Sequence, residues 1–180
     1  MRKPSRAAVT ALVLWTALAA PARAAPDPYR EYLDKYRCPV ADRLQRLYEA
    51  GDPAVTRDRF LVIELLEHKF GYVQCLFHDH ETRLTCEAAS GFWYDKADVP
   101  RRMFLAPVKI AALARLGFST DDSHGNFSLD RPVPEPVDFT AIADLMLKAL
   151  YDGYDARVDK TLTFIAPFAP GLTLACDPVG

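Results

Sequence analysis

The sequence is poor in glycine and contains none of the short motifs that mark common classes of enzyme. Only 8 of its 180 residues are glycine, and no Gly-x-Gly-x-x-Gly segment occurs, so a phosphate-binding loop of that type has no support. A Gly-x-Ser-x-Gly nucleophile elbow and a His-Glu-x-x-His zinc helix are also absent. No two cysteines stand three positions apart, which excludes a zinc ribbon or a Cys-x-x-Cys redox site. We therefore expect a protein that is not an enzyme and that needs no cofactor.

Long apolar runs are equally scarce, and the one that is present lies at the N-terminus. Three basic residues among the first six precede an apolar run over 7–20, and Ala22-Arg23-Ala24 then supplies a small-x-small pattern. This order is typical of a cleavable signal peptide, here residues 1–24. A membrane-spanning helix needs roughly 20 apolar residues, more than this run contains, so cleavage is favoured. The alternative is that the segment is retained as a membrane anchor. We expect a periplasmic or secreted protein with no membrane span after cleavage.

The mature chain has neither the size nor the charge of a multidomain or nucleic-acid-binding protein. Cleavage after residue 24 leaves 180 − 24 = 156 residues, which fits one domain over 25–180. The signal segment removes four basic residues, so the mature charge is 18 − 24 = −6. Because no basic stripe is present, nucleic acids and anionic membrane surfaces are poor candidate partners.

Four cysteines follow the signal segment: Cys38, Cys75, Cys86 and Cys176. An even number in an exported chain favours two disulfides. Four cysteines can pair in three ways, and their spacing alone does not select one of them.

The hydrophobic periodicity predicts three helices. Apolar residues recur at helical spacing over 29–50, but Pro39 interrupts them, so this segment is expected to be one broken helix or two short ones. A second helix is expected over 105–116. A third begins after the capping residue Asp138 and is expected to end at Gly153.

Alternating or continuous apolar residues predict strands over 59–66, 72–78, 83–88 and, more briefly, 127–129. An extended tail including 162–165 follows the last helix. The resulting order is helix, three-stranded meander, helix, strand, helix and tail. That order favours an α+β fold, a two-layer sandwich in which the helices pack on one face of an antiparallel sheet.

The alternation in the second and third strands also sets their register. A one-residue slip would turn one apolar set outward, so the expected pairs are Val73 with Ala88, Cys75 with Cys86, and Phe77 with Leu84. Directly opposed cysteines in an oxidising compartment favour a Cys75–Cys86 bridge, and Cys38 would then join Cys176. Reduced core thiols are the alternative for the first pair.

Several of these segments share their spacing and hydrophobic type with one known family. They are Tyr72-Val73-Gln74, Leu84-Thr85-Cys86-Glu87-Ala88, Leu113-Ala114-Arg115-Leu116-Gly117-Phe118, Asn126-Phe127 and the amphipathic helix 138–152. Together they cover about 60–154 and resemble the bacterial type III secretion chaperone-like family, often called TY-Chap.

The resemblance implies a small α/β sandwich that binds protein segments, frequently as a homodimer, without catalysis. It supplies no catalytic residues. Export and the four cysteines set this chain apart from secretion chaperones of that fold, which act in the cytosol.

The densest set of candidate metal ligands is the predicted hairpin 78–81. His78 and His80 stand there beside two carboxylates, and His68 or His124 could complete a zinc or copper site. Polar residues are expected at a hairpin tip in any case, so solvated turn residues are the favoured interpretation. A small metal-dependent periplasmic enzyme is the alternative.

An aromatic cluster, Phe92-Trp93-Tyr94, follows the third strand. Aromatic residues dominate the energetics of many protein interfaces, so the cluster could anchor a protein partner. The favoured interpretation is that it covers the end of the core. We expect an exported protein-binding or chaperone-like module whose partner is a protein. A structural envelope subunit that assembles with itself is a further alternative.

Overall fold

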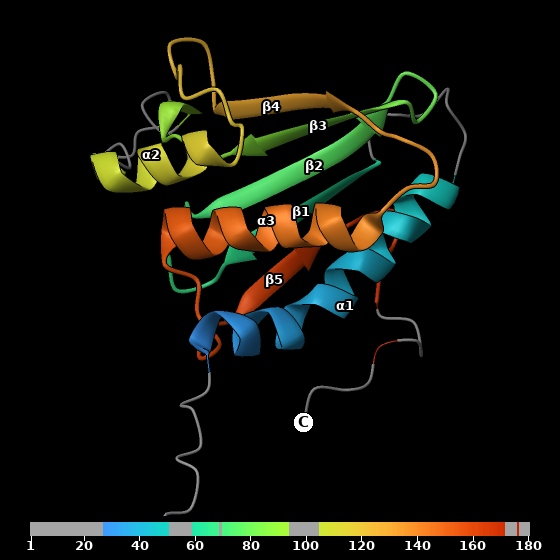
Figure 1. Ribbon diagram of the computed structural model, residues 1–180, viewed down its shortest axis with the longest axis horizontal. Helices are drawn as coiled ribbons and strands as arrows, with labels where there is room; N and C mark the ends of the chain where they lie inside the picture. The colour runs from blue at the N-terminus through green and yellow to red at the C-terminus, as the bar shows by residue number, and fades with distance from the viewer. Residues whose placement is uncertain (1–26, 51–58, 69, 94–104, 172–175, 177–180) are drawn as a thin grey trace, which may run out of the picture.

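The computed structural model describes residues 27–50, 59–68, 70–93, 105–171 and 176 (Figure 1). The signal segment lies outside these residues. Helices and strands follow one another along the chain as α1 (Pro28–Glu49), β1 (Phe60–Leu65), β2 (Tyr72–His78), β3 (Arg83–Ala88), α2 (Pro107–Arg115), β4 (Phe127–Pro132), α3 (Phe139–Tyr154) and β5 (Leu162–Ile165).

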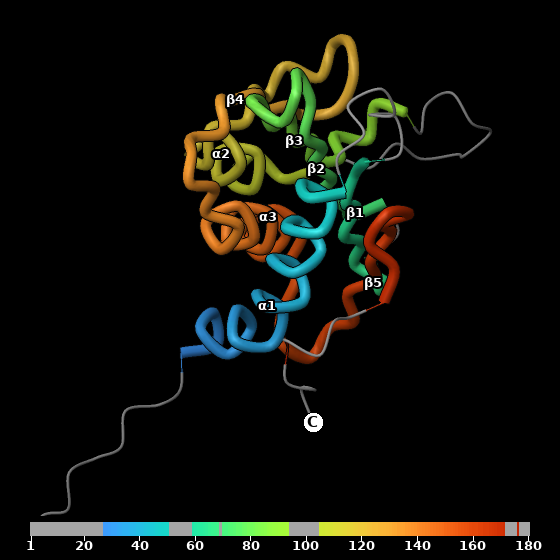
Figure 2. The backbone as a smooth tube through the Cα atoms, turned by 90° about the vertical axis from the view of Figure 1, so that its right-hand side faces the viewer, coloured from blue at the N-terminus to red at the C-terminus, as the bar shows by residue number. Residues whose placement is uncertain are grey.

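The strands form one five-stranded sheet in the order β4-β3-β2-β1-β5, and every neighbouring pair is antiparallel. In Figure 2, turned by 90° from Figure 1, the strands run from β4 at the upper left to β5 at the lower right, and α1, α2 and α3 lie along one face of them. The expected α+β architecture, with helices packed on one face of an antiparallel sheet, is therefore confirmed.

The register of the central hairpin agrees with the alternation of its side chains. Val73 lies opposite Ala88, and Phe77 lies opposite Leu84. These four side chains are at most 1% exposed, because they point toward the helices. The residues between them point to the opposite face of the sheet and are only partly buried.

Helix α1 is continuous, which corrects the expectation of a broken helix or two short ones. Asp27 caps its start by accepting a hydrogen bond from the Tyr29 N–H at 3.0 Å. Pro39 lies inside the helix, where it removes one backbone hydrogen bond and causes a bend rather than a break. The change of direction is visible in Figure 1. Completely buried side chains on both sides of the proline, Tyr32 and Leu44 among them, hold the two halves together.

Helix α3 does not end at Gly153, as the sequence suggested, but runs on to Tyr154, where Asp155 adopts a left-handed conformation as the C-cap. A Cβ atom at Gly153 would lie 3.1 Å from a methyl carbon of Leu113 in α2. Gly153 therefore permits the close approach of α2 and α3 instead of terminating the helix.

Two extended segments are longer or better paired than their local patterns indicated. The strand predicted over 127–129 extends to Pro132, which β4 accommodates because it is an edge strand. Residues 162–165, expected as part of an extended tail, form β5 and pair with β1 at the other edge.

Two disulfides are present, Cys75–Cys86 and Cys38–Cys176. The first joins β2 to β3 inside the core, and the second fastens the C-terminal tail to α1. None of the helices described is both long and apolar enough to span a membrane.

Candidate functional site

A groove of about 430 Å³ lies between the end of β4 and the first turn of α3. In Figure 1 the segment after β4 leaves the sheet and turns back to the start of α3, close to the β2–β3 hairpin. Seven apolar residues line the groove: Leu84, Pro132, Val133, Pro134, Val137, Ala141 and Ile142. Leu84 and Ile142 are nearly fully buried and form its floor, while Val133 and Val137 are half-buried walls.

Hydrogen bonds at both ends hold the segment between β4 and α3 in place. The Val133 N–H donates to the Thr82 carbonyl in the β2–β3 turn at 2.8 Å. The Tyr48 hydroxyl donates to the Glu135 carboxylate, and this bond raises the pKa of the tyrosine. At the start of α3, the Asp138 carboxylate accepts a hydrogen bond from the Ala141 N–H at 2.9 Å. The groove is thus bounded by backbone held at three points.

One cation stands at this groove. Arg131 occupies an inward-facing position of β4, in line with the buried side chains of Phe127 and Leu129. Its guanidinium makes no hydrogen bond or ion pair with any residue that the structure describes. The groove therefore combines apolar walls with a positive charge available to a ligand.

The chain matches the family model described as T3SS (YopN, CesT) and YbjN peptide-binding chaperone 3, over residues 34–167. This span includes the whole sheet, α2, α3 and most of α1. The chain belongs to this chaperone family. No curated protein and no solved structure matches it.

In this chaperone-family protein, the hairpin histidine His78 belongs to a polar network on the sheet face opposite the helices. Its Nε2 lies 2.9 Å from the Thr85 hydroxyl, which donates to the Asp130 carboxylate at 2.8 Å. Arg83 also pairs with Asp130, and together with the Thr85 hydrogen bond it lowers the pKa of that carboxyl. Because the Thr85 proton is directed to Asp130, His78 Nε2 must donate to the hydroxyl. The network joins β2, β3 and β4, and the histidine is not placed to activate Thr85.

The other candidate metal ligands are not brought together with His78. His80 is exposed at the hairpin tip. His124 is exposed in the loop before β4, whose first residue pairs with Ala88 at the end of β3 away from that hairpin. Across the described ranges of the chain, no three His, Cys, Asp or Glu side chains are grouped closely enough to hold a metal ion.

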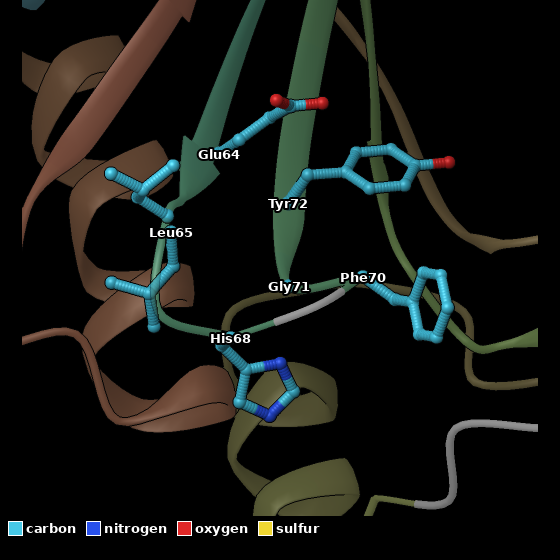
Figure 3. Close-up of a pocket in the computed structure, with 7 residues that line it drawn as sticks. Glu64, Leu65, His68, Phe70, Gly71 and Tyr72 are labelled. Carbon is cyan, nitrogen blue, oxygen red and sulfur yellow. The ribbon is translucent and has the colours of Figure 1, made fainter.

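His68 lies in the turn between β1 and β2, beside a hollow of about 280 Å³ (Figure 3). Its Nδ1 is buried and makes no hydrogen bond with another described residue, and its ring packs edge-on against Tyr154. Figure 3 shows the imidazole pointing away from the Glu64 carboxylate. A Cβ at Gly71 would lie only 3.0 Å from Nδ1, so the glycine leaves room for a packed ring. The hollow does not pair an acid with a base.

The two described residues of the aromatic cluster differ in exposure. Phe92 is half-buried and its ring contacts that of Trp93 edge-on, with centroids 5.0 Å apart. Trp93 itself is 50% exposed. Tyr94 lies outside the described residues. Trp93 is therefore accessible to a partner, and it remains a candidate contact residue.

Sequence reasoning did not identify the groove of this chaperone-family protein. The only local signal was Arg131, a charged residue that continues the inward alternation of Phe127 and Leu129. The proline-rich segment after it has the composition of a connector, and nothing in that composition indicates that it forms one wall of a groove against α3.

Proposed function

We propose that this protein is exported and binds segments of other proteins in a chaperone-like manner, in the periplasm or outside the cell. The observation that carries the proposal is the family match over 34–167, which covers nearly the whole described fold. Binding without catalysis is the role that this family assignment favours.

Export is supported by the N-terminal segment and by the cysteines. The basic residues, the apolar run and Ala22-Arg23-Ala24 follow the order that signal peptidase recognises. Both disulfides of the fold fit an oxidising compartment. N-terminal sequencing of the protein recovered from the periplasm should give a chain that begins at residue 25. An intact N-terminus in the cytosol would contradict export.

Site-specific photo-crosslinking in cells tests the binding function. A photoreactive amino acid replaces Ala141 in the groove or Trp93 in the aromatic cluster, and Arg115 on α2 serves as an exposed control position. The proposal expects a crosslinked client protein from at least one of the first two positions and none from the control. Equal crosslinking from all three positions would indicate non-specific contact and would contradict it.

The family resemblance also leads us to include a homodimer in the proposal. Sedimentation equilibrium of the mature protein measures this directly, and the expected result is a dimer mass over the whole concentration range. A monomer mass would remove the dimer from the proposal without affecting client binding.

A further inference from the structure

We propose that the groove beside α3 selects extended peptide segments in which an aspartate or glutamate stands close to apolar side chains. This inference rests on the proposed binding function and adds to it a location and a ligand chemistry. It is carried by the juxtaposition of apolar walls with Arg131, which has no ion-pair partner among the residues that the structure describes.

The walls suit apolar side chains of a ligand. The side chains of Leu84 and Ile142 close the bottom of the groove, and those of Val133 and Val137 rise on its flanks. A leucine-sized side chain placed between them would leave water for an apolar environment, which is the main driving force for binding in such grooves.

The charge at the groove determines which polar group should accompany that side chain. Arg131 has no carboxylate partner among the described residues, and a guanidinium binds a carboxylate through two parallel hydrogen bonds. Asp138 is the acidic residue of the lining, but its carboxylate already accepts the Ala141 N–H as the N-cap of α3. The positive end of the helix offsets that negative charge. An acidic ligand side chain therefore completes the ion pair that the groove leaves open.

An inward-pointing charge can also protect an edge strand from pairing with another chain, but β4 is already protected. Ser119 exchanges two backbone hydrogen bonds with Ser128 of β4, and this bridge covers part of the outer edge of the strand. Pro132 has no N–H to offer at the other end of the strand. Since little free edge remains, we assign Arg131 to ligand recognition through side chains rather than to edge protection.

The test uses the disulfide-bonded mature protein and fluorescein-labelled synthetic peptides in which leucines alternate with aspartates. Matched peptides carry asparagines or lysines in place of the aspartates, and fluorescence anisotropy measures each Kd. For the wild type we expect the aspartate peptide to bind about tenfold more tightly than the asparagine peptide, the effect of one charged hydrogen-bonded pair.

The decisive variant is Arg131→Glu, which should lose the aspartate preference and favour the lysine peptide. Arg115→Glu makes the same change in net charge at an exposed position of α2 and should leave the preference unchanged. Far-UV circular dichroism verifies that both variants are folded. Equal effects of the two variants, or equal binding of the aspartate and asparagine peptides, would overturn the inference.

A parallel assay separates this inference from the function on which it rests. The wild type is added to a chemically unfolded protein of known sequence, and light scattering follows aggregation. If aggregation is suppressed while the peptides show no charge preference, the groove assignment fails and the chaperone-like function stands. If no peptide binds and aggregation is unaffected, both fail.

Discussion

Arg59 is an arginine enclosed in the interior, with only 1% of its surface exposed. Its guanidinium donates to the carbonyl of Leu47 at 2.9 Å and to that of Tyr48 at 3.1 Å, both in the last turn of α1. It also forms an ion pair with Glu81 in the β2–β3 turn. One side chain therefore donates to carbonyls at the helix end, where intrahelical donors run out, and joins α1 to the hairpin.

Replacing this arginine should be costly. For Arg59→Met we expect a loss of about 2–4 kcal/mol in the free energy of unfolding, because buried carbonyls and a carboxylate lose their charged donor. Urea denaturation followed by circular dichroism measures the loss. Arg83→Met, which breaks a pair at the surface, is the control and should cost about 0–1 kcal/mol. Similar losses for the two variants would show that the buried interactions of Arg59 contribute no more to stability than an ion pair at the surface.

At the scale of elements, α2 and α3 pack closely because Gly153 has no side chain. Leu113 is completely buried against it. A glycine inside a helix costs roughly 1 kcal/mol relative to alanine. The close approach of the two helices is the physical reason for accepting that cost.

Gly153→Ala should therefore destabilise the protein in spite of its better helix propensity. The added methyl group would displace a buried leucine, and overpacking of this kind costs about 1–3 kcal/mol. The same substitution in a Leu113→Val background should cost less, since valine is shorter. Thermal unfolding of the four proteins in this double-mutant cycle gives the coupling energy, and strict additivity would contradict the proposed contact.

The stability of the pairing between β3 and β4 should depend on pH. The Thr85 hydroxyl and the Arg83 guanidinium hold the pKa of Asp130 below its ordinary value of 3.8. Because the folded-state pKa is the lower one, the stabilisation is present above the unfolded value and is lost as the pH falls through the folded value.

We therefore expect amide exchange in β4 to accelerate, relative to β1, as the pH is lowered below about 4. Hydrogen exchange followed by NMR provides the measurement. In Asp130→Asn the strand should exchange faster at neutral pH and show little further change on acidification. A β4 whose protection is independent of pH in the wild type would contradict this role.

At the scale of the whole molecule, the C-terminal tail is fastened to the first helix. The Tyr36 hydroxyl donates to the Lys160 carbonyl at 2.5 Å, and Arg46 donates to the carbonyls of Pro170 and Gly171. The Cys38–Cys176 disulfide also joins the tail to α1, and its two cysteines are 138 residues apart in sequence. The tail in turn supplies β5, so α1 indirectly holds one edge of the sheet.

Cys176→Ser should lower the free energy of unfolding by about 2–5 kcal/mol. The disulfide restricts the unfolded chain by closing a long loop, and its removal restores the entropy of the unfolded state. Relative to the wild type, amide hydrogen exchange should accelerate more in β5 than in β2, because the Cys75–Cys86 disulfide of β2 is still present. Guanidinium denaturation of the variant and of the wild type gives the magnitude. An unchanged midpoint together with unchanged exchange in β5 would show that the noncovalent contacts suffice.

Much of the fold was predictable because its determinants are local. The alternation of Val73, Cys75 and Phe77 sets which face of β2 is buried, and the opposing strand repeats it after a four-residue turn. The cap at Asp138 is also a matter of neighbouring residues. Such features depend on backbone geometry over a few positions, which is why they can be recognised in one sequence.

The parts that were missed depend on distant segments. Pro39 looked like a break, yet buried contacts along both halves of α1 keep the helix continuous. Gly153 looked like a helix end, but its role is set by Leu113, which lies in another helix. In both cases packing with distant residues outweighed the local preference of one residue.

The sequence by itself determined the order of the elements, the register of the central hairpin and the family resemblance, since each rests on residues close together in the chain. Only the tertiary structure decided that β5 pairs with β1, and that Arg131 lies beside a groove between β4 and α3 with no ion-pair partner in the described part of the chain. Both features arise where segments far apart in sequence meet during formation of the core: β5 against β1, and Leu84 beside Ile142 in the groove. No local pattern specifies such a meeting, because its free energy belongs to the packing of the whole chain.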